Sequence, residues 1–324
     1  MGAFGLQTHI WNNNFKSVLL LAAFPILLML LIFALSLGFV SLAGEYVSLQ
    51  EGVQLAVAQS IRSIPFAFLG AGVWFLIAWT FHQKMIEAAV GAKGISRREA
   101  PELYNLLENL AISNGMTMPT LKVIETQALN AFASGVSDKS YTVTVTRGLL
   151  ATLNRDELEA VLAHELTHIA NRDVRLLIVT VIFVGIFSFV GELVFRGLFR
   201  SGVRIGGHTR SRNGDSRGGG ILILAAVALI AIAYFLAIML RFALSRKREF
   251  LADAGAVELT RNPDAMAAAL HKISGRSAVD APVDVRQMMI DSDARFAGLF
   301  ATHPSIDKRI EALSKYAGAR AVSP

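Results

Sequence analysis

The sequence reads His164-Glu165-Leu166-Thr167-His168 in the middle of a segment whose apolar residues recur at helical spacing. Residues four positions apart lie on one face of a helix, so His164 and His168 can direct two imidazole nitrogens at one metal ion. Glu165 lies one position round the helix, within reach of a water bound to that ion. Two imidazoles and an adjacent carboxylate form the H-E-x-x-H pattern of zinc-dependent peptide hydrolases. With only seven histidines in 324 residues, two surface histidines at this spacing are a poor explanation.

The residues around the motif predict a helix in a water-facing domain. Asn154 can cap its start, and Glu157 can reach back to the cap as in a capping box. The expected buried stripe consists of Leu158, Val161, Leu162 and Ile169. The other faces carry charged and polar residues, which excludes a helix immersed in lipid and therefore an intramembrane protease: Arg155, Asp156, Glu159, Asn171, Arg172 and Asp173.

Composition places this motif in a membrane protein, because 53% of the residues are hydrophobic and only 17% are charged. The chain has no cysteine, which excludes disulfides and thiolate zinc ligands and leaves histidine and carboxylate. The net charge of +6 could indicate a nucleic-acid partner. However, Lys and Arg cluster beside apolar runs, so we assign them to an anionic lipid surface and expect no nucleic acid.

Four apolar runs are candidate membrane spans, and they cover residues 17–44, 63–83, 176–191 and 218–240. A helix needs about 20 apolar residues to cross a hydrocarbon core of about 30 Å. The first run could instead be a signal peptide cleaved near Ser41-Leu42-Ala43. Its apolar core is longer than the 7–15 residues of a signal peptide, so we favour an uncleaved anchor.

Loop charges predict the orientation. Residues 45–62 carry two glutamates and one arginine, whereas four basic residues follow the second run: Lys84, Lys93, Arg97 and Arg98. The positive-inside rule then places residues 45–62 outside and the H-E-x-x-H motif in the cytoplasm. The connection 196–220 carries six arginines and one aspartate, and full spanning by its flanking runs would export it against this rule. We favour full spanning over a hairpin that enters one leaflet.

A small sheet is expected ahead of the metal helix. A helix over 102–111 ends at Asn114-Gly115, and the β-branched segments 120–126 and 140–146 read as two strands separated by a turn at 135–139. The predicted fold is mainly α with a small β-sheet: a multi-pass α-helical membrane protein with a zincin-like cytoplasmic protease domain. The expected domains are an N-terminal transmembrane hairpin (1–83), the first half of the protease domain (84–173), a second hydrophobic hairpin (174–244) and the second half of the protease domain (245–324).

A catalytic zinc typically has three protein ligands, and Glu249 is the candidate for the third. The fourth apolar run leads into a helical segment in which Glu249 and Asp253 share one face. A hairpin that leaves the end of the first helix and returns beside it brings Glu249 back to the histidines. Asp253 could then accept the second ring N–H of a ligating histidine. The alternative is that Glu249 pairs with Arg246 or Arg248, and we favour ligation.

These residues resemble the HtpX family of bacterial membrane metalloproteases, which belong to the gluzincin group and are relatives of the CAAX prenyl proteases. Four motifs carry the resemblance: H-E-L-T-H, the E-x-x-x-D segment from Glu249 to Asp253, Asn130-Ala131-Phe132-Ala133, and Thr302-His303-Pro304 with Arg309-Ile310. They occur in the family's order along nearly the whole chain. Neither the arginine-rich connection nor residues 276–298 have a recognisable counterpart.

The resemblance and the pattern together imply one zinc ion per chain, held by His164, His168 and Glu249, with Glu165 as general base and then acid. His303 is expected to stabilise the oxyanion or lie near the metal, or else to be structural; Arg309 would orient it or cap a helix. Four residues are expected at the edge of the small sheet, paired with the backbone of an extended substrate rather than in an ordinary loop: Asn130, Ala131, Phe132 and Ala133.

The sequence thus predicts a multi-pass zinc endopeptidase of the bacterial inner membrane with a cytoplasmic active site. By resemblance, its partners are the lipid bilayer and polypeptide substrates, namely misfolded or damaged membrane proteins that it removes in quality control. One alternative is a zinc-stabilised membrane scaffold or chaperone-like adaptor, but a structural site has no use for Glu165 beside an open position. Another is a transporter, which the nearly uncharged runs disfavour, since only Glu192 interrupts them.

Overall fold

The computed structural model describes residues 6–43, 46, 48–200, 217–242, 246–286, 288–291 and 303–319. The protein is mostly helical with one small mixed sheet, and it divides into two compact units. One unit comprises residues 1–16, 80–179 and 242–324, and the other comprises residues 17–79 and 180–241. Most of the arginine-rich connection, residues 201–216, lies outside the described residues.

Among the described residues, four helices are long and apolar enough to cross a membrane, in agreement with the four candidate spans expected from the sequence. They are α1 (Leu6–Ala43), α2 (Leu49–Val90), α6 (Asp173–Arg200) and α7 (Arg217–Phe242). Each helix extends beyond its apolar run, because a helix does not have to end where its lipid-compatible residues end. The loop expected over 45–62 is therefore mostly helical, since α2 already begins at Leu49.

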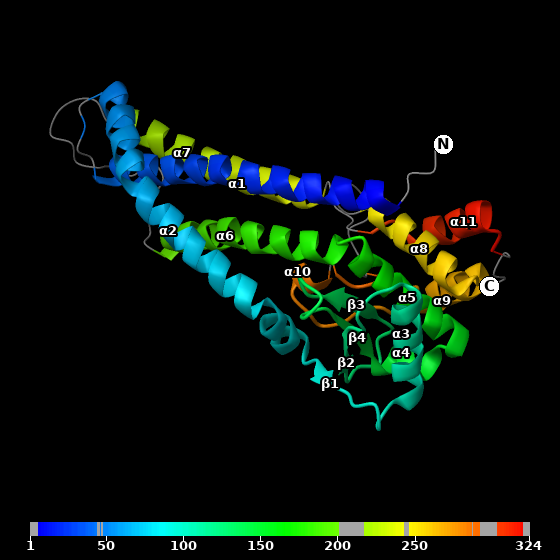
Figure 1. The fold of residues 1–324 in the computed structure, drawn as a ribbon. Coiled ribbons are helices and arrows are strands. Elements are labelled where there is room, and N and C mark those ends of the chain that lie inside the picture. The colour runs from blue at the N-terminus through cyan, green and yellow to red at the C-terminus, as the bar shows by residue number, and fades with distance from the viewer. Residues whose placement is uncertain are drawn as a thin grey trace. The chain divides into compact units, whose positions relative to one another are not determined.

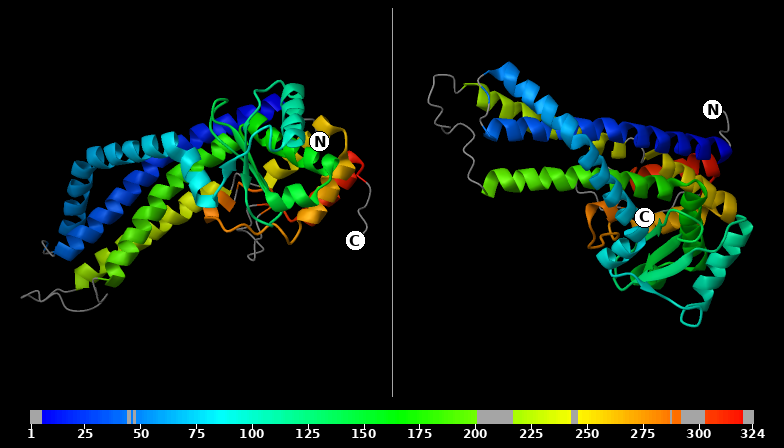
Figure 2. Two further views of the ribbon diagram at one scale, coloured as in Figure 1. Left: turned by 90° about the horizontal axis from the view of Figure 1, so that it is seen from below. Right: turned by 60° about the vertical axis from the view of Figure 1, so that its left-hand side comes forward.

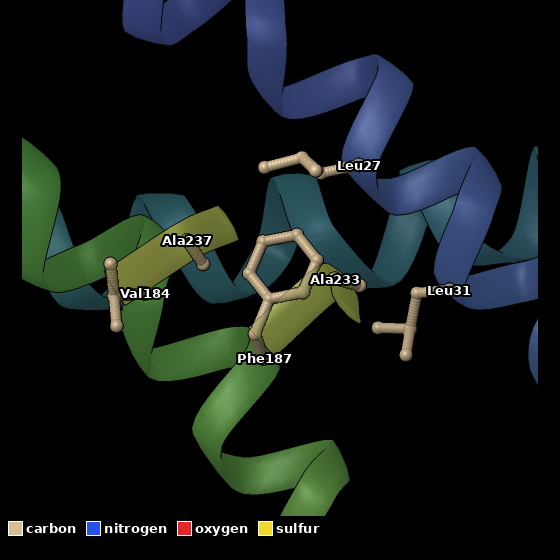
Figure 3. Packing of buried hydrophobic residues seen from close by; sticks show 6 residues of the cluster. All are labelled: Leu27, Leu31, Val184, Phe187, Ala233 and Ala237. Carbon is tan, nitrogen blue, oxygen red and sulfur yellow. The ribbon is translucent and has the colours of Figure 1, made fainter. Parts of the chain in front are cut away.

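Helices α1, α6 and α7 pack together in the second unit, and Figure 2 shows them running side by side. Figure 3 shows the contact, in which the Phe187 ring of α6 lies against Leu27 and Leu31 of α1. Ala233 and Ala237 of α7 complete the cluster, and their small side chains let the helices approach closely. Helix α2 instead exposes large apolar side chains, as a lipid-facing helix does: Ile61, Phe66, Leu69, Leu76 and Ile77.

The sheet of the first unit has the strand order β1-β2-β4-β3. Its strands are β1 (Lys93–Gly94), β2 (Thr120–Ile124), β3 (Ala131–Ser134) and β4 (Thr142–Thr146). Strands β2 and β4 are the two predicted strands, but they pair in parallel instead of forming a hairpin. The turn at 135–139 joins β3 to β4. Residues 131–133, which the family resemblance places at the edge of the sheet, lie in β3 at that edge, although their sequence shows no alternation that marks a strand.

Within the described residues, seven helices lie wholly in this unit: α3 (Pro101–Ser113), α4 (Arg147–Thr152), α5 (Arg155–Ala170), α8 (Arg246–Thr260), α9 (Pro263–Ile273), α10 (Val283–Arg286) and α11 (Ile306–Ala317). Figure 1 shows α5 beside the sheet, and α5 contacts β3 and β4 as well as α3, α8 and α9. Helix α5 is therefore the central element of the unit, and 11 of its residues are buried.

The local signals read from the sequence around α5 are confirmed. The Asn154 side chain accepts a hydrogen bond from the Glu157 backbone at 2.9 Å, and the Glu157 carboxylate accepts one from the Asn154 backbone at 2.9 Å. This capping box fixes where α5 begins and hence which residues face inward. Glu157 also accepts a hydrogen bond from Lys272 of α9 at 2.7 Å, so the start of α5 is tied to a neighbouring helix.

Helices α5 and α8 are in close contact at Gly255. A Cβ atom at this position would lie 2.4 Å from Cγ2 and 2.7 Å from Oγ1 of Thr167. Thr167 belongs to the H-E-x-x-H motif, and its own hydroxyl is turned back to the Ala163 carbonyl oxygen at 2.8 Å. The glycine therefore sets the spacing between the helix that carries both histidines and the helix that carries Glu249.

Candidate metal centre

His164 and His168 lie one turn apart on the buried face of α5, and their Nε2 atoms converge to 3.1 Å. The two rings are nearly perpendicular, with an interplanar angle of 89°. The His164 side chain is fully buried and that of His168 is 13% exposed. When both rings are neutral and carry their hydrogen on Nδ1, no hydrogen lies between the two Nε2 atoms. Two imidazole nitrogens that converge in this way can act as two ligands of one cation.

Each imidazole is held from its other nitrogen by a carboxylate. Nδ1 of His164 lies 3.0 Å from Asp253 Oδ1, and Nδ1 of His168 lies 3.0 Å from Asp173 Oδ2. A carboxylate that accepts the Nδ1–H fixes the tautomer, so the Nε2 lone pair of each ring is left free. Both rings are thereby oriented with the same atom toward the same point.

Glu249 comes from the first turn of α8, and it lies beside both histidines. Its Oε1 is 3.6 Å from Nε2 of His168 and its Oε2 is 3.7 Å from Nε2 of His164. The ligand atoms of the three residues all lie within 4.8 Å of one another, so the group could hold a metal ion. A tetrahedral ion with bonds of about 2.0–2.1 Å requires ligand separations of about 3.3 Å, and the observed 3.1–3.7 Å is close to that.

Glu165 is 1% exposed, and neither carboxylate oxygen makes a hydrogen bond of normal geometry within the described part of the chain. Burial raises the pKa of this carboxyl to about 7. The charge of His168 and the backbone N–H of Ala133 oppose that rise, and the charge of Glu249 adds to it. An unpaired buried carboxylate is costly, which marks Glu165 as a group kept for chemistry or for an ion.

The charges around the two histidines separate their pKa values. Burial is the strongest influence on both rings, and it lowers the pKa of His164 to about 4. At His168 the carboxylates of Asp173, Glu249 and Glu165 outweigh burial and raise the pKa to about 9. The pKa of the Glu249 carboxyl is lowered despite its burial, chiefly by the nearby His303 and His168. The buried carboxylates of Asp173, Glu249 and Glu165 place several negative charges around His168, and this excess of negative charge favours a bound cation.

Arg309 of α11 is fully buried and binds Asp253 with two hydrogen bonds, from Nε to Oδ2 at 2.9 Å and from Nη2 to Oδ1 at 2.6 Å. The paired charges raise the pKa of Arg309 and lower that of Asp253, although burial opposes both shifts. Arg309 therefore holds the carboxylate that holds His164. Arg309 also donates from Nη1 to the Ile290 carbonyl oxygen at 2.7 Å, and it lies 3.5 Å from Glu249 Oε2 and from the His164 ring.

The remaining predicted residues surround the same point. His303 is 7% exposed at its side chain, with Nδ1 3.3 Å from Glu249 Oε2. Ala131, Phe132 and Ala133 form β3 at the edge of the sheet, and Ala133 lines the small cavity beside Glu165. Asn130 directs its side-chain amide to the carbonyl oxygens of Ser277 at 2.7 Å and Asp291 at 2.9 Å.

Sequence reasoning assigned no site role to Asp173 or Arg248. Asp173 follows His168 by five residues, at the first turn of α6, so it could have been found as the second of two carboxylates that the two rings require. Arg248 lies next to Glu249, lines the cavity and donates from Nη1 to the Asp173 backbone oxygen at 3.3 Å. The sequence suggested it only as an ion-pair partner of Glu249.

The chain matches known proteins along most of its length. The family model "Peptidase family M48" matches residues 97–317. A "Protease HtpX homolog" from Bacteroides fragilis is 42% identical over 327 residues, covering 96% of this chain and 99% of the relative. The homolog from Ligilactobacillus salivarius is 34% identical with coverages of 95% and 99%, and that from Listeria monocytogenes is 39% identical with coverages of 76% and 84%.

One solved structure, "Crystal Structure of S. mikatae Ste24p", is 20% identical with a TM-score of 0.48, covering 76% of this chain and 57% of that one. The curated relatives are much more similar, at 34–42% identity, and two of the three reported cover at least 95% of this chain. The chain belongs to peptidase family M48 and is an HtpX-like metalloprotease.

Proposed function

We propose that this metalloprotease is a zinc endopeptidase of the bacterial inner membrane that hydrolyses misfolded or damaged membrane proteins on the cytoplasmic side. The observation that carries the proposal is the convergence of three ligand atoms, from His164, His168 and Glu249, beside the buried and unpaired carboxylate of Glu165. Neither feature alone indicates hydrolysis. Together they provide a cation and a base within one small space.

Zinc is the metal that this ligand set suits. The chain offers two imidazole nitrogens and one carboxylate, which is a common set in zinc peptidases, and it leaves a fourth position open. A zinc ion bound there would polarise the scissile carbonyl and activate water for attack. Asp253 and Asp173 would keep both Nε2 atoms directed at the ion, and Arg309 would keep Asp253 in place.

Glu165 would take the proton from the attacking water and later give it to the leaving nitrogen. A general base works best when its pKa lies near the working pH, and burial brings the pKa of Glu165 to about 7. The carboxylate has no competing hydrogen bond of normal geometry, so it is free to face the reacting atoms. His303, which lines the same cavity, would stabilise the oxygen on which charge develops.

The substrate would bind as an extended strand. Residues 131–133 form an edge of the sheet, and an edge strand offers backbone groups that pair with main chain whatever the side chains are. Such recognition suits a protease that acts on unfolded segments of many proteins. The four apolar helices and the basic stretch after α2 support a membrane location with this site on the cytoplasmic side.

The decisive experiment compares the purified full-length protein with its Glu165→Gln variant. We expect both to contain one zinc per chain by elemental analysis, and only the unaltered protein to cleave an unfolded membrane-protein substrate in detergent. Glu159→Gln, at a partly exposed position of α5, is the matched control and should retain full activity. Equal proteolysis by Glu165→Gln would exclude the general-base role, and bound zinc without proteolysis in the unaltered protein would favour the scaffold alternative.

A further inference from the structure

The outer edge of β3 is already occupied by another part of the chain. Phe132 forms an antiparallel bridge with Met289, and the backbone N–H of Ile290 donates to the Ala131 carbonyl oxygen at 2.9 Å. We call residues Met288–Asp291 the edge segment. It lies alongside β3 on the side opposite β4, which is the side where an added strand would pair.

Side chains of the site hold the edge segment in place. Asn130 Nδ2 donates to the Asp291 carbonyl oxygen at 2.9 Å, and Arg309 Nη1 donates to the Ile290 carbonyl oxygen at 2.7 Å. The Ser277 hydroxyl donates to the Asp291 carboxylate at 2.6 Å. Met289 is 1% exposed and packs in a cluster with Phe132. The segment is thus bound by the same two side chains, Asn130 and Arg309, that the family motifs mark.

The edge segment also closes the space next to the candidate metal centre. Met288 lines one cavity together with Glu165, Glu249 and His303. That cavity has a volume of about 30 Å³, far below the roughly 300–1,000 Å³ of a typical ligand pocket. A cavity of this size does not accommodate a peptide residue, and Met288 is one of the side chains that bound it.

We propose that the edge segment takes the place of substrate on β3, so that the structure is a self-inhibited state from which Met288–Asp291 must move before a peptide can pair with the strand. This inference rests on the proposed function, in which β3 binds substrate. It adds a regulation of that site, because one edge cannot pair with two strands at once.

Competition within one chain favours long unfolded substrates over short ones. A tethered segment competes with an effective concentration of about millimolar, so a peptide must bind well to displace it. The apparent affinity for substrate is reduced by the fraction of molecules whose edge is free. An extended polypeptide that makes several contacts overcomes this reduction at a lower concentration than a folded loop or a peptide of fewer residues. The same competition limits cleavage of neighbouring copies.

The absence of cysteine allows a direct test by crosslinking. We would introduce Phe132→Cys and Met289→Cys into the Glu165→Gln background, so that nothing is hydrolysed. Directly opposite residues of an antiparallel pair lie about 4.5–5.5 Å apart at Cα, within the range that a disulfide spans. The full-length protein in detergent is oxidised mildly, and mass spectrometry follows disulfide formation with and without a synthetic 12-residue peptide of Ala, Val, Leu and Ser.

The disulfide should form readily in the absence of peptide. Peptide at ten times its apparent dissociation constant, determined by fluorescence anisotropy, should slow its formation about tenfold, because the two cysteines meet only while the edge segment is docked. The matched control pair is Gly94→Cys with Lys122→Cys, opposite residues of β1 and β2 at the other edge of the sheet. Its rate of oxidation should not respond to the peptide. Failure of the first pair to crosslink, or a rate that bound peptide leaves unchanged, would overturn the inference.

A second variant covers the case in which the cysteine pair does not fold. Ser277→Ala, with Glu165 intact, removes one bond to the edge segment and should lower the KM for the peptide about two- to tenfold without lowering kcat. An unchanged or higher KM would contradict the inference. The two proposals fail separately: hydrolysis without an effect of peptide on crosslinking rejects self-inhibition alone, whereas slowed crosslinking without hydrolysis by the unaltered protein rejects the catalytic proposal alone.

Discussion

Nδ1 of His168 lies 3.0 Å from Oδ2 of Asp173, the residue that begins the next helix. Asp253 stands in the same relation to His164, but from α8. The two rings are therefore oriented by carboxylates from opposite ends of the chain segment that contains the apolar hairpin. Asp253 belongs to the E-x-x-x-D motif, whereas the role of Asp173 is evident only from its position beside His168.

Asp173→Asn should weaken zinc binding. An amide can still contact Nδ1, but it does not raise the basicity of the imidazole as a carboxylate does, and such changes typically lower metal affinity about 10- to 100-fold. Competition with a chromophoric chelator would measure the affinity. Asp138→Asn, in the exposed turn before β4, is the control. Equal affinities for both variants would remove Asp173 from the set of positioning residues.

Glu249→Ala should lower the zinc content of the purified protein, because only two of the three proposed ligands remain. Elemental analysis after dialysis against a weak chelator would show the loss. Glu258→Ala changes an exposed carboxylate on the same helix and should leave the zinc content at that of the unaltered protein. A full complement of zinc in Glu249→Ala would exclude this residue as a ligand.

Arg309→Lys should destabilise the first unit even though the charge is kept. Lysine cannot reproduce the two hydrogen bonds to Asp253 together with the bond to the Ile290 carbonyl oxygen. Breaking a buried ion pair costs about 3–5 kcal/mol, and retention of the charge should make the loss smaller. Thermal unfolding in detergent would report it, with Lys308→Arg on the exposed side of α11 as the control. An unchanged Tm would contradict the role of Arg309.

Gly255→Ala tests the close contact between α5 and α8. Alanine is favoured over glycine in a helix by about 1 kcal/mol, but overpacking a tight contact costs about 1–3 kcal/mol. A Cβ atom 2.4 Å from Thr167 Cγ2 makes the steric cost dominate, so we expect lower stability and weaker zinc binding. Adding Thr167→Ala should recover most of both. If Gly255→Ala alone raises the Tm, the contact is looser than described.

The sequence was sufficient wherever a signal is local. The capping box of Asn154 and Glu157 and the spacing of His164 and His168 depend only on neighbours within one helix, so α5 and its ligands could be predicted. Glu249 was accessible because the two apolar runs between it and α5 read as a hairpin, and a hairpin returns near its start.

Contacts between distant segments without periodicity could not be predicted. Strand β3 is buried along its whole length, because α5 contacts it and Phe132 packs in a cluster with Val285 and Met289, so its residues show no alternation. The parallel pairing of β2 with β4 likewise depends on the position of β3 beyond β4. No residue of β2 or β4 indicates that position. The side-chain amide of Asn130 donates to the carbonyl oxygens of Ser277 and Asp291, about 150 residues later in the chain. No sequence pattern indicates these two contacts.

The proposed ligands stand on either side of the apolar pair α6 and α7 in the order of synthesis. A growing chain that has emerged only as far as α7 possesses both histidines and Glu165 but lacks the third ligand and Arg309. Its metal centre is incomplete until the membrane hairpin has been made and the following helix has reached α5. A nascent protease of this design stays harmless until its insertion is finished.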